Sequence, residues 1–210
     1  MLNLILTPFL CSSNQNEHLP LKKLLFLTTL LALFGASLIG QDNQTYPKIG
    51  LVAEGGISFG GDALATVIFT DGEDQDLNAG QGGYLAAGAA LHFTENISLR
   101  GTLGFLYQTT AAENANIRLT RLPLNLVGFY EFSNGIRVGG GVSSHANIRL
   151  KGDGFLPDTD YTSNLGPRFE LAYKWIGLSY TAMEYTSETD GVFSANAIGV
   201  SVSFVIPNRY

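Results

Sequence analysis

The strongest constraint in this sequence is an alternation of side chains that keeps charged residues on one side of each segment. In a β-strand, successive side chains point to opposite faces. Residues 48–59 illustrate the pattern: alternate positions from Ile49 to Phe59 are apolar or glycine, and the positions between them include Glu54 and Ser58. A period of two that separates charged from apolar side chains predicts β-strands with one apolar face.

Eight segments follow this pattern, and in each of them one set of alternate residues carries no charge. These uncharged sets span residues 49–59, 85–93, 97–107, 122–132, 136–148, 169–175, 178–182 and 198–206. Most of them are long enough to cross a bilayer, which takes a strand of about 9–11 residues tilted by about 45°. We therefore expect an all-β fold, an eight-stranded antiparallel up-and-down transmembrane β-barrel.

The connections between these segments alternate in length. Tight hairpin turns are predicted at 95–96, 133–135 and 175–177, and longer polar loops at 60–82, 111–116, 151–163 and 188–194. Short turns on the periplasmic side and longer loops outside are typical of outer-membrane barrels. Residues 63–70 in the first loop are apolar, and we expect them to extend the first hairpin beyond the membrane or to form a further strand.

A soluble eight-stranded barrel such as a lipocalin also alternates, but its apolar face lines the lumen. Here the charged face is also rich in glycine and serine, which suits a crowded interior, whereas the other face carries Leu, Ile, Val and Phe. Aromatic residues lie towards the ends of the apolar face, as at the two bilayer interfaces. We expect the periplasmic belt to contain Phe93, Tyr130, Phe132, Tyr173, Trp175, Tyr180 and Phe204, and the outer belt Phe59, Tyr107 and Phe169. A membrane barrel is favoured, and a lipocalin-like secreted barrel is the alternative.

The first forty residues have the character of a targeting segment. Lys22 and Lys23 precede an apolar stretch that ends in small residues before Gln41, which is the form of a cleavable signal peptide. We expect residues 1–20 to be a non-native N-terminal extension, 21–40 the signal peptide and 41–210 the outer-membrane barrel domain. A retained membrane anchor is the alternative. The net charge of −6 argues against nucleic-acid binding.

The expected plan resembles the small outer-membrane barrels of the OmpA/OmpX type and the outer membrane protein β-barrel domain families, over about residues 46–206. Gly199, Val202 and Phe204 look like the C-terminal assembly signal of such barrels, in which hydrophobic residues alternate after a glycine. The chain departs from this pattern at Ile198, where a polar residue is usual, and by running on to Tyr210. The resemblance implies a bacterial outer-membrane location, insertion by the barrel-assembly machinery, outer-membrane lipids and lipopolysaccharide as neighbours, and a monomer. No pattern indicates a cofactor.

The inward face of the expected barrel collects ten ionisable side chains. They are Glu54, Arg100, Arg121, Glu131, Arg137, His145, Arg149, Arg168, Glu170 and Lys174. An eight-stranded barrel is barely wide enough for its own side chains, and a buried charge without a partner costs several kcal/mol. We therefore expect a polar network that largely plugs the lumen, and a structural or surface-interaction role. The six basic and three acidic residues leave the lumen positive, so a small passive channel that favours anions is the alternative.

Two weaker patterns concern chemistry. Ser143 and His145 share the inward face, as the groups of a lipid A-modifying hydrolase or acyltransferase would, but no motif of those enzymes accompanies them, and we expect no catalytic residue. Asp74, Asp76 and Asn78 have the oxygen spacing that opens a calcium loop, but its turn glycine and closing glutamate are missing. A solvated acidic loop is favoured over a weak divalent-cation site.

Overall fold

The computed structural model describes residues 46–68, 74–110, 116–188 and 191–206. The chain divides into two compact units, Met1–Asp42 and Asn43–Tyr210, and every described residue belongs to the second. The expectations for residues 1–20 and 21–40 lie outside the described residues. Within the described ranges, no helix is long and apolar enough to cross a membrane.

Thirteen β-strands are found in the described part of the chain. They are β1 (Lys48–Phe59), β2 (Ala63–Ile68), β3 (Asp74–Asn78), β4 (Gly82–His92), β5 (Ile97–Thr109), β6 (Arg118–Glu131), β7 (Ile136–Lys151), β8 (Thr159–Ser163), β9 (Gly166–Tyr173), β10 (Ile176–Thr181), β11 (Glu184–Ser187), β12 (Gly191–Ser194) and β13 (Ala197–Ile206).

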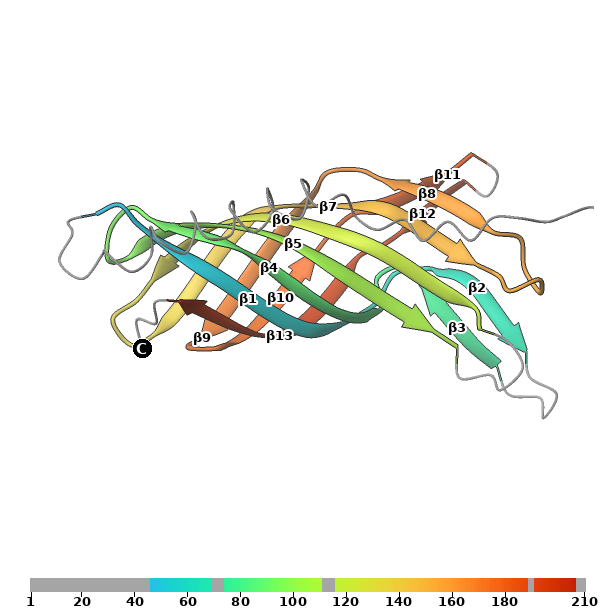
Figure 1. The fold of residues 1–210 in the computed structure, drawn as a ribbon, viewed down its shortest axis with the longest axis horizontal. Helices are drawn as coiled ribbons and strands as arrows, with labels where there is room; N and C mark the ends of the chain where they lie inside the picture. The colour runs from blue at the N-terminus through green and yellow to red at the C-terminus, as the bar shows by residue number, and fades with distance from the viewer. Residues whose placement is uncertain (1–45, 69–73, 111–115, 189–190, 207–210) are drawn as a thin grey trace, which may run out of the picture. The chain divides into compact units, whose positions relative to one another are not determined.

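Eight of these strands form a closed antiparallel barrel (Figure 1). Hydrogen-bonded neighbours follow chain order, β1–β4–β5–β6–β7–β9–β10–β13, and β13 returns to pair with β1. In this closing ladder Leu51 faces Ile206 and Phe59 faces Ile198. The expected all-β fold, an eight-stranded antiparallel up-and-down barrel, is confirmed.

The strands are staggered around the barrel. The ladder that starts at Phe59 passes through Ile198, Tyr180, Phe169, Gly140, Gly128, Leu99 and Leu91 and returns to β1 at Ile49, ten residues from its start. With about 3.3 Å per residue and about 4.8 Å between strands, this stagger tilts the strands by about 40° and gives a backbone radius of about 8 Å. The interior therefore has room for its own side chains and little else.

The two ends of the barrel differ. At one end, the turn end, short connections join β4 to β5, β6 to β7 and β9 to β10. At the other, the loop end, β8, β11 and β12 continue the sheet from β7, while β2 and β3 pair only with each other (Figure 1). The apolar residues 63–68 thus form one strand of an extra hairpin, outside the barrel ladder.

The outer surface of the barrel wall is apolar. Alternate residues of every barrel strand expose large hydrophobic side chains, and Leu85 reaches 75 % exposure. Others on this face are Ile49, Leu51, Ile57, Leu103, Leu124, Leu126, Val138, Leu171, Leu178, Val200 and Val202. Water-soluble proteins rarely expose contiguous apolar surface on this scale, so the wall is built for a lipid environment and disfavours the lipocalin-like alternative.

Aromatic side chains also lie on this outer face. Phe93, Phe132 and Trp175 are exposed at the connections of the turn end. The expectation that Tyr180 lies near that end is wrong. The β9–β10 ladder begins beside the turn at Ile176 and Tyr173, and Tyr180 pairs with Phe169 and Ile198 near the opposite end of β10. Tyr180 therefore belongs with the aromatic residues of the loop-end half.

At the loop end the polarity of the two faces is reversed, with apolar residues inside and polar residues outside. A hydrophobic core fills the interior there, formed by Leu77, Ala79, Ile117, Leu119, Ile148, Leu150, Tyr161, Met183, Tyr185 and Ala195. The positions that face outward from the same strands are polar and exposed, for example Asp160, Glu184 and Thr186. The loop end therefore packs like a water-soluble protein, with apolar residues inside and polar residues outside, whereas the barrel wall exposes apolar residues.

A β-bulge in β7 produces this exchange on one side of the barrel. Thr120 pairs with Arg149 but Leu122 pairs with Ala146, so two residues of β7 stand opposite Arg121. One of them, Asn147, has a φ of 48°. Because a bulge adds one residue, the side chains beyond it change faces. The expectations that Ile148 faces lipid and Arg149 lines the lumen are wrong for this reason: Ile148 is buried and Arg149 is exposed.

This arrangement predicts different costs for two leucines of β6. Leu119 is fully buried in the loop-end core, whereas Leu124 is 46 % exposed on the barrel wall. Leu119→Ala should lower the free energy of unfolding by about 2–5 kcal/mol, because it leaves a cavity, and Leu124→Ala should cost clearly less. Urea unfolding of the refolded barrel, followed by the fluorescence of the single tryptophan, Trp175, measures both. Equal losses would contradict the buried core.

Candidate functional site

Buried charges gather inside the barrel wall around Arg100. Its Nη1 atom lies 3.6 Å from Glu54 Oε2 and 3.8 Å from Glu170 Oε1, and all three side chains are 5 % exposed or less. The same nitrogen donates to Ser203 Oγ at 3.4 Å. One arginine of β5 thus ties together residues of β1, β9 and β13.

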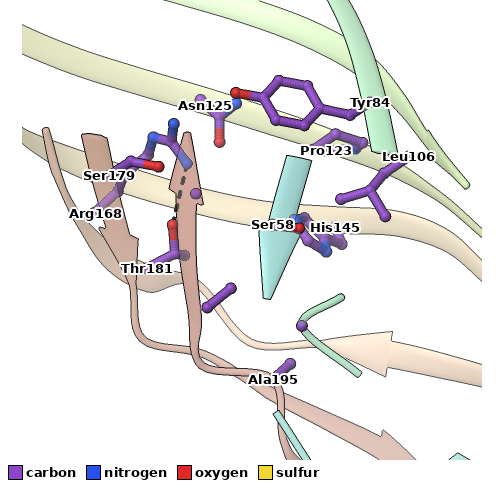
Figure 2. A pocket seen from close by; sticks show the side chains of 13 residues that line it. Ser58, Tyr84, Leu106, Pro123, Asn125, His145, Arg168, Ser179, Thr181 and Ala195 are labelled. Carbon is purple, nitrogen blue, oxygen red and sulfur yellow. Dashed lines mark hydrogen bonds between the residues drawn. The ribbon is translucent and has the colours of Figure 1, made fainter. Parts of the chain in front are cut away.

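Each of the two carboxylates has a second partner. The Tyr84 hydroxyl donates to Glu54 Oε1 at 2.7 Å, and Arg168 Nη2 lies 3.4 Å from Glu170 Oε2. Arg168 Nη1 also donates to Thr181 Oγ1 at 3.1 Å (Figure 2). Buried ions are stable only when they are paired and hydrogen-bonded, and these shared contacts give each carboxylate two partners, although the Arg168 Nε atom is buried without one.

Phe129 lies within cation–π distance of two guanidinium groups near the turn end. The Arg100 Cζ atom lies 4.8 Å from the ring centroid and the Arg137 Cζ atom 5.7 Å from it, within the range of cation–π contacts. Arg137 Nη2 also donates to the carbonyl oxygen of Lys174 at 2.8 Å. A Cβ atom at Gly139 would lie 2.6 Å from this ring, so the Phe129 ring can occupy this position only because residue 139 is a glycine.

A small cavity of about 40 Å³ lies further towards the loop end (Figure 2). Tyr84, Asn125 and Arg168 line it on the network side, and Ala195 belongs to the apolar core. A buried water needs about 10–15 Å³, so the cavity has room for a few water molecules.

Arg121 lies between the network and the apolar core. Its side chain is fully buried, and its Nη1 and Nη2 atoms donate to the carbonyl oxygens of Ala79 and Gln81. These two residues belong to the connection between β3 and β4. Arg121 therefore fastens the base of the β2–β3 hairpin to the barrel wall.

Not all of the predicted lumen residues lie inside the barrel. Those buried in the interior are Glu54, Arg100, Arg121, Arg137, Arg168 and Glu170. Glu131 is half-buried at the turn end, opposite Arg137 in the ladder.

The expected lumen position is wrong for Lys174 and Arg149. Lys174 lies in the β9–β10 turn with a φ of 53°, where the alternation of the strand has ended, and its Nζ atom lies 5.3 Å from the Tyr173 ring centroid. Arg149, turned outward by the bulge, forms an exposed ion pair with Asp160 at 3.4 Å.

Ser143 and His145 have different partners. The His145 Nδ1 atom forms a hydrogen bond with the Tyr185 hydroxyl, while Ser143 Oγ donates to Asn125 Oδ1 at 2.7 Å. Burial raises the pKa of Tyr185, in the loop-end extension, above its ordinary value, so this hydroxyl stays protonated and can donate to His145. The arrangement is that of a polar side-chain network.

Asp74, Asp76 and Asn78 lie on strand β3 and do not form a loop. Asp76 Oδ1 accepts a hydrogen bond from Thr66 Oγ1 at 2.6 Å, and Asn78 Nδ2 donates to Gln81 Oε1 at 3.0 Å. An extended strand does not wrap its ligands around one ion, as a calcium loop does. Within the described ranges, no group of three or more His, Cys, Asp or Glu side chains could hold a metal ion.

The residues that resemble an assembly signal lie on β13, which closes the barrel. Gly199 is buried, whereas Val202 and Phe204 point outward. Their recognition by the barrel-assembly machinery stays a prediction.

Three residues of the interior were missed by sequence reasoning: Tyr84, Phe129 and Tyr185. Tyr84 stands one position before the expected second segment, on its inward set, and extending that segment would have found it. Phe129 is an aromatic residue at an inward position, among charged and polar residues, and the alternation gives no reason for an aromatic side chain there. Tyr185 lies beyond the expected seventh segment.

Comparison with known proteins concerns the fold only. No protein-family model and no curated protein matches the chain. Among solved structures, it is similar to Ail, the attachment invasion locus protein of Yersinia pestis (9 % identity, TM-score 0.44, covering 76 % of this chain and 100 % of Ail). The outer membrane protein AlkL in DMPC bilayers has 17 % identity and a TM-score of 0.45, over 79 % of this chain and 93 % of AlkL. The N-terminal β-barrel domain of Pseudomonas aeruginosa OprF has 11 % identity and a TM-score of 0.29, over 76 % and 100 %.

The buried network predicts a large effect of removing its central cation. Arg100→Met leaves Glu54 and Glu170 buried without it, and should lower the free energy of unfolding by about 3–5 kcal/mol. Arg149→Met removes the same charge from an exposed ion pair and should cost about 0–1 kcal/mol. Urea unfolding of both variants, refolded in vesicles of one lipid composition, measures the difference between their free energies of unfolding. Equal effects would show that Arg100 contributes no more than a surface ion pair.

Proposed function

We propose that this chain is a monomeric outer-membrane β-barrel with a closed lumen and a structural or surface-interaction role. The observation that carries the proposal is an interior of two layers. The ion-pair network around Arg100 joins strands across the barrel interior, and the apolar core lies beyond it at the loop end. An ion moving through would have to displace buried ion pairs and then enter an apolar core without its water, and both steps are unfavourable.

The exterior supports the membrane part of this proposal. The apolar wall requires lipid around it, and a closed barrel leaves no strand edge exposed to that lipid. Outer-membrane lipids and lipopolysaccharide are therefore its expected neighbours, with the barrel-assembly machinery as the agent of insertion.

The loop end supports a role at the surface. The strands β8, β11 and β12 and the β2–β3 hairpin extend beyond the barrel, and β3, β8 and β11 carry polar exposed residues. A role without catalysis is supported by Ser143 and His145, whose side chains bond to Asn125 and Tyr185 and not to each other.

Conductance of the purified protein in planar lipid bilayers tests the closed lumen. The wild-type protein should carry no steady ion current. The double variant Arg100→Ser/Arg121→Ser should raise the conductance, because it removes the central cation of the network and also releases the carbonyl groups of Ala79 and Gln81 at the barrel mouth. Lys174→Ser removes an exposed cation at the turn end and should stay closed. A steady wild-type current would contradict the proposal.

A passive channel for anions is the second candidate. It is favoured by the excess of arginine in the interior, where Arg100, Arg121, Arg137 and Arg168 outnumber Glu54 and Glu170. Under this alternative the wild-type current is steady, and its reversal potential in a potassium chloride gradient indicates chloride as the carrier.

Labelling of single cysteines in intact cells tests which end faces outward. Val192 is 62 % exposed in the β11–β12 hairpin, and Asn134 lies exposed in the β6–β7 turn. With Cys11 replaced by Ser, the Val192→Cys variant should react with a membrane-impermeant maleimide in intact cells. The Asn134→Cys variant should react only after the outer membrane is permeabilised. The reverse pattern would contradict the proposed orientation.

A further inference from the structure

The small cavity between the ion-pair network and the apolar core has a positively charged wall. Its volume is about 40 Å³, and Arg168, Asn125 and Ser179 lie in the wall (Figure 2). Of the described residues that line it, none is Asp, Glu or Lys, and Arg168 carries the permanent charge among them. The cavity therefore presents a cation and no carboxylate to whatever occupies it.

Arg168 has one donor left for a ligand. The residue is 9 % exposed. Its Nη1 atom donates to Thr181 Oγ1 at 3.1 Å, and its Nη2 atom lies 3.4 Å from Glu170 Oε2. The Nε atom is buried without a hydrogen-bond partner. Burying the N–H of a charged group without an acceptor is unfavourable, so an acceptor bound in the cavity would stabilise this arginine.

Neutral side chains of the same wall add further donors. Asn125 donates one amide hydrogen to Thr102 Oγ1 at 3.2 Å, and the amide group carries a second. The Thr181 hydroxyl accepts from Arg168, which leaves its own hydrogen to donate. Ser179, buried two residues before Thr181 on β10, supplies another hydroxyl. An anion accepts from all of these groups at once, whereas a water molecule must also donate.

The charges inside the barrel do not balance among the described residues. The buried cations are Arg100, Arg121, Arg137 and Arg168, and the buried carboxylates are Glu54 and Glu170. The half-buried Glu131 stands opposite Arg137 and offsets a third cation. Arg121 is the fourth, and the ion pairs found within the described residues do not include it.

Arg121 lies directly behind the cavity wall. Its guanidinium group donates to the carbonyl oxygens of Ala79 and Gln81, and Gly80, the residue between them, lines the cavity. Charges interact strongly in the low dielectric of a protein interior. An anion in the cavity is therefore attracted by Arg121 as well as by Arg168, and it would offset the excess positive charge.

We propose that this cavity binds one halide ion, chloride under physiological conditions, which Arg168, Asn125 and Ser179 hold by hydrogen bonds. A space for a few water molecules accepts one such ion, whereas phosphate and sulfate are too large. Apolar side chains such as Leu106 and Pro123 complete the wall, and they suit chloride better than the strongly hydrated fluoride. The inference goes beyond the proposed function, because it needs only the buried cavity and no partner at the surface.

Urea unfolding at different chloride concentrations tests the proposal. The barrel is refolded in phosphatidylcholine vesicles in mixtures of sodium chloride and sodium gluconate, at a constant ionic strength that keeps charge screening the same. Gluconate is too large for the cavity. If the folded state binds one chloride, the folding equilibrium constant should rise about tenfold for each tenfold increase in chloride above its Kd. A folding constant that does not depend on chloride would show that the cavity holds water only, and would overturn the proposal.

Three variants test the position of the ion. Asn125→Asp builds a carboxylate of the same shape into the wall, so it should abolish the chloride dependence at neutral pH. Ser179→Ala removes one donor and should weaken chloride binding about tenfold. Ser203→Ala is the control, since it removes a buried hydroxyl that bonds to Arg100 but does not line the cavity. It should lower stability and leave the chloride dependence unchanged.

Crystals of the barrel refolded in sodium bromide locate the ion directly. The anomalous signal of bromine should show one peak in the cavity, within hydrogen-bonding distance of Arg168 and Ser179, and the peak should be missing from the Asn125→Asp variant. Bromide found only at exposed residues would be adventitious and would overturn the site. The same conclusion would follow if Asn125→Asp and Ser179→Ala kept the chloride dependence of the wild-type protein.

Discussion

The ladder between β1 and β13 is the contact on which the rest of this structure depends. Lipid offers no hydrogen bonds, so a sheet with an open edge cannot remain in a bilayer. Pairing of Leu51 with Ile206 and Phe59 with Ile198 removes both edges at once. Closure also creates the narrow interior in which Arg100 meets Glu54 and Glu170, since the three residues come from strands that are distant in the sequence.

The barrel itself could be predicted from the sequence because its cause is local. When a strand is regular, its side chains alternate between two faces. The alternate positions that carry the charges then identify which residues point inward. Glu54, Arg100 and Arg168 illustrate this, since the alternation alone places them on the inward face where the structure has them. The hairpin turns at residues 95–96 and 133–135 are also local, because each is a short polar connection between two alternating segments.

The rest of the site depends on events that the period does not report. One extra residue at Asn147 moves every later side chain of β7 to the opposite face, and no residue type in that segment predicts this change. Lys174 left the pattern because a turn begins there. The partners of Arg121 are backbone carbonyl groups of a distant connection, and Phe129 is held by two arginines from other strands. Such contacts arise only from tertiary structure.

The loop-end core has a consequence for the order in which the molecule is completed. Leu77 comes from β3, whereas Tyr185 lies in β11 and Ala195 directly follows β12. Contacts between residues so far apart in sequence form late, because the long intervening loop must first be closed. The apolar cap therefore cannot assemble until β11 and β12 are in place.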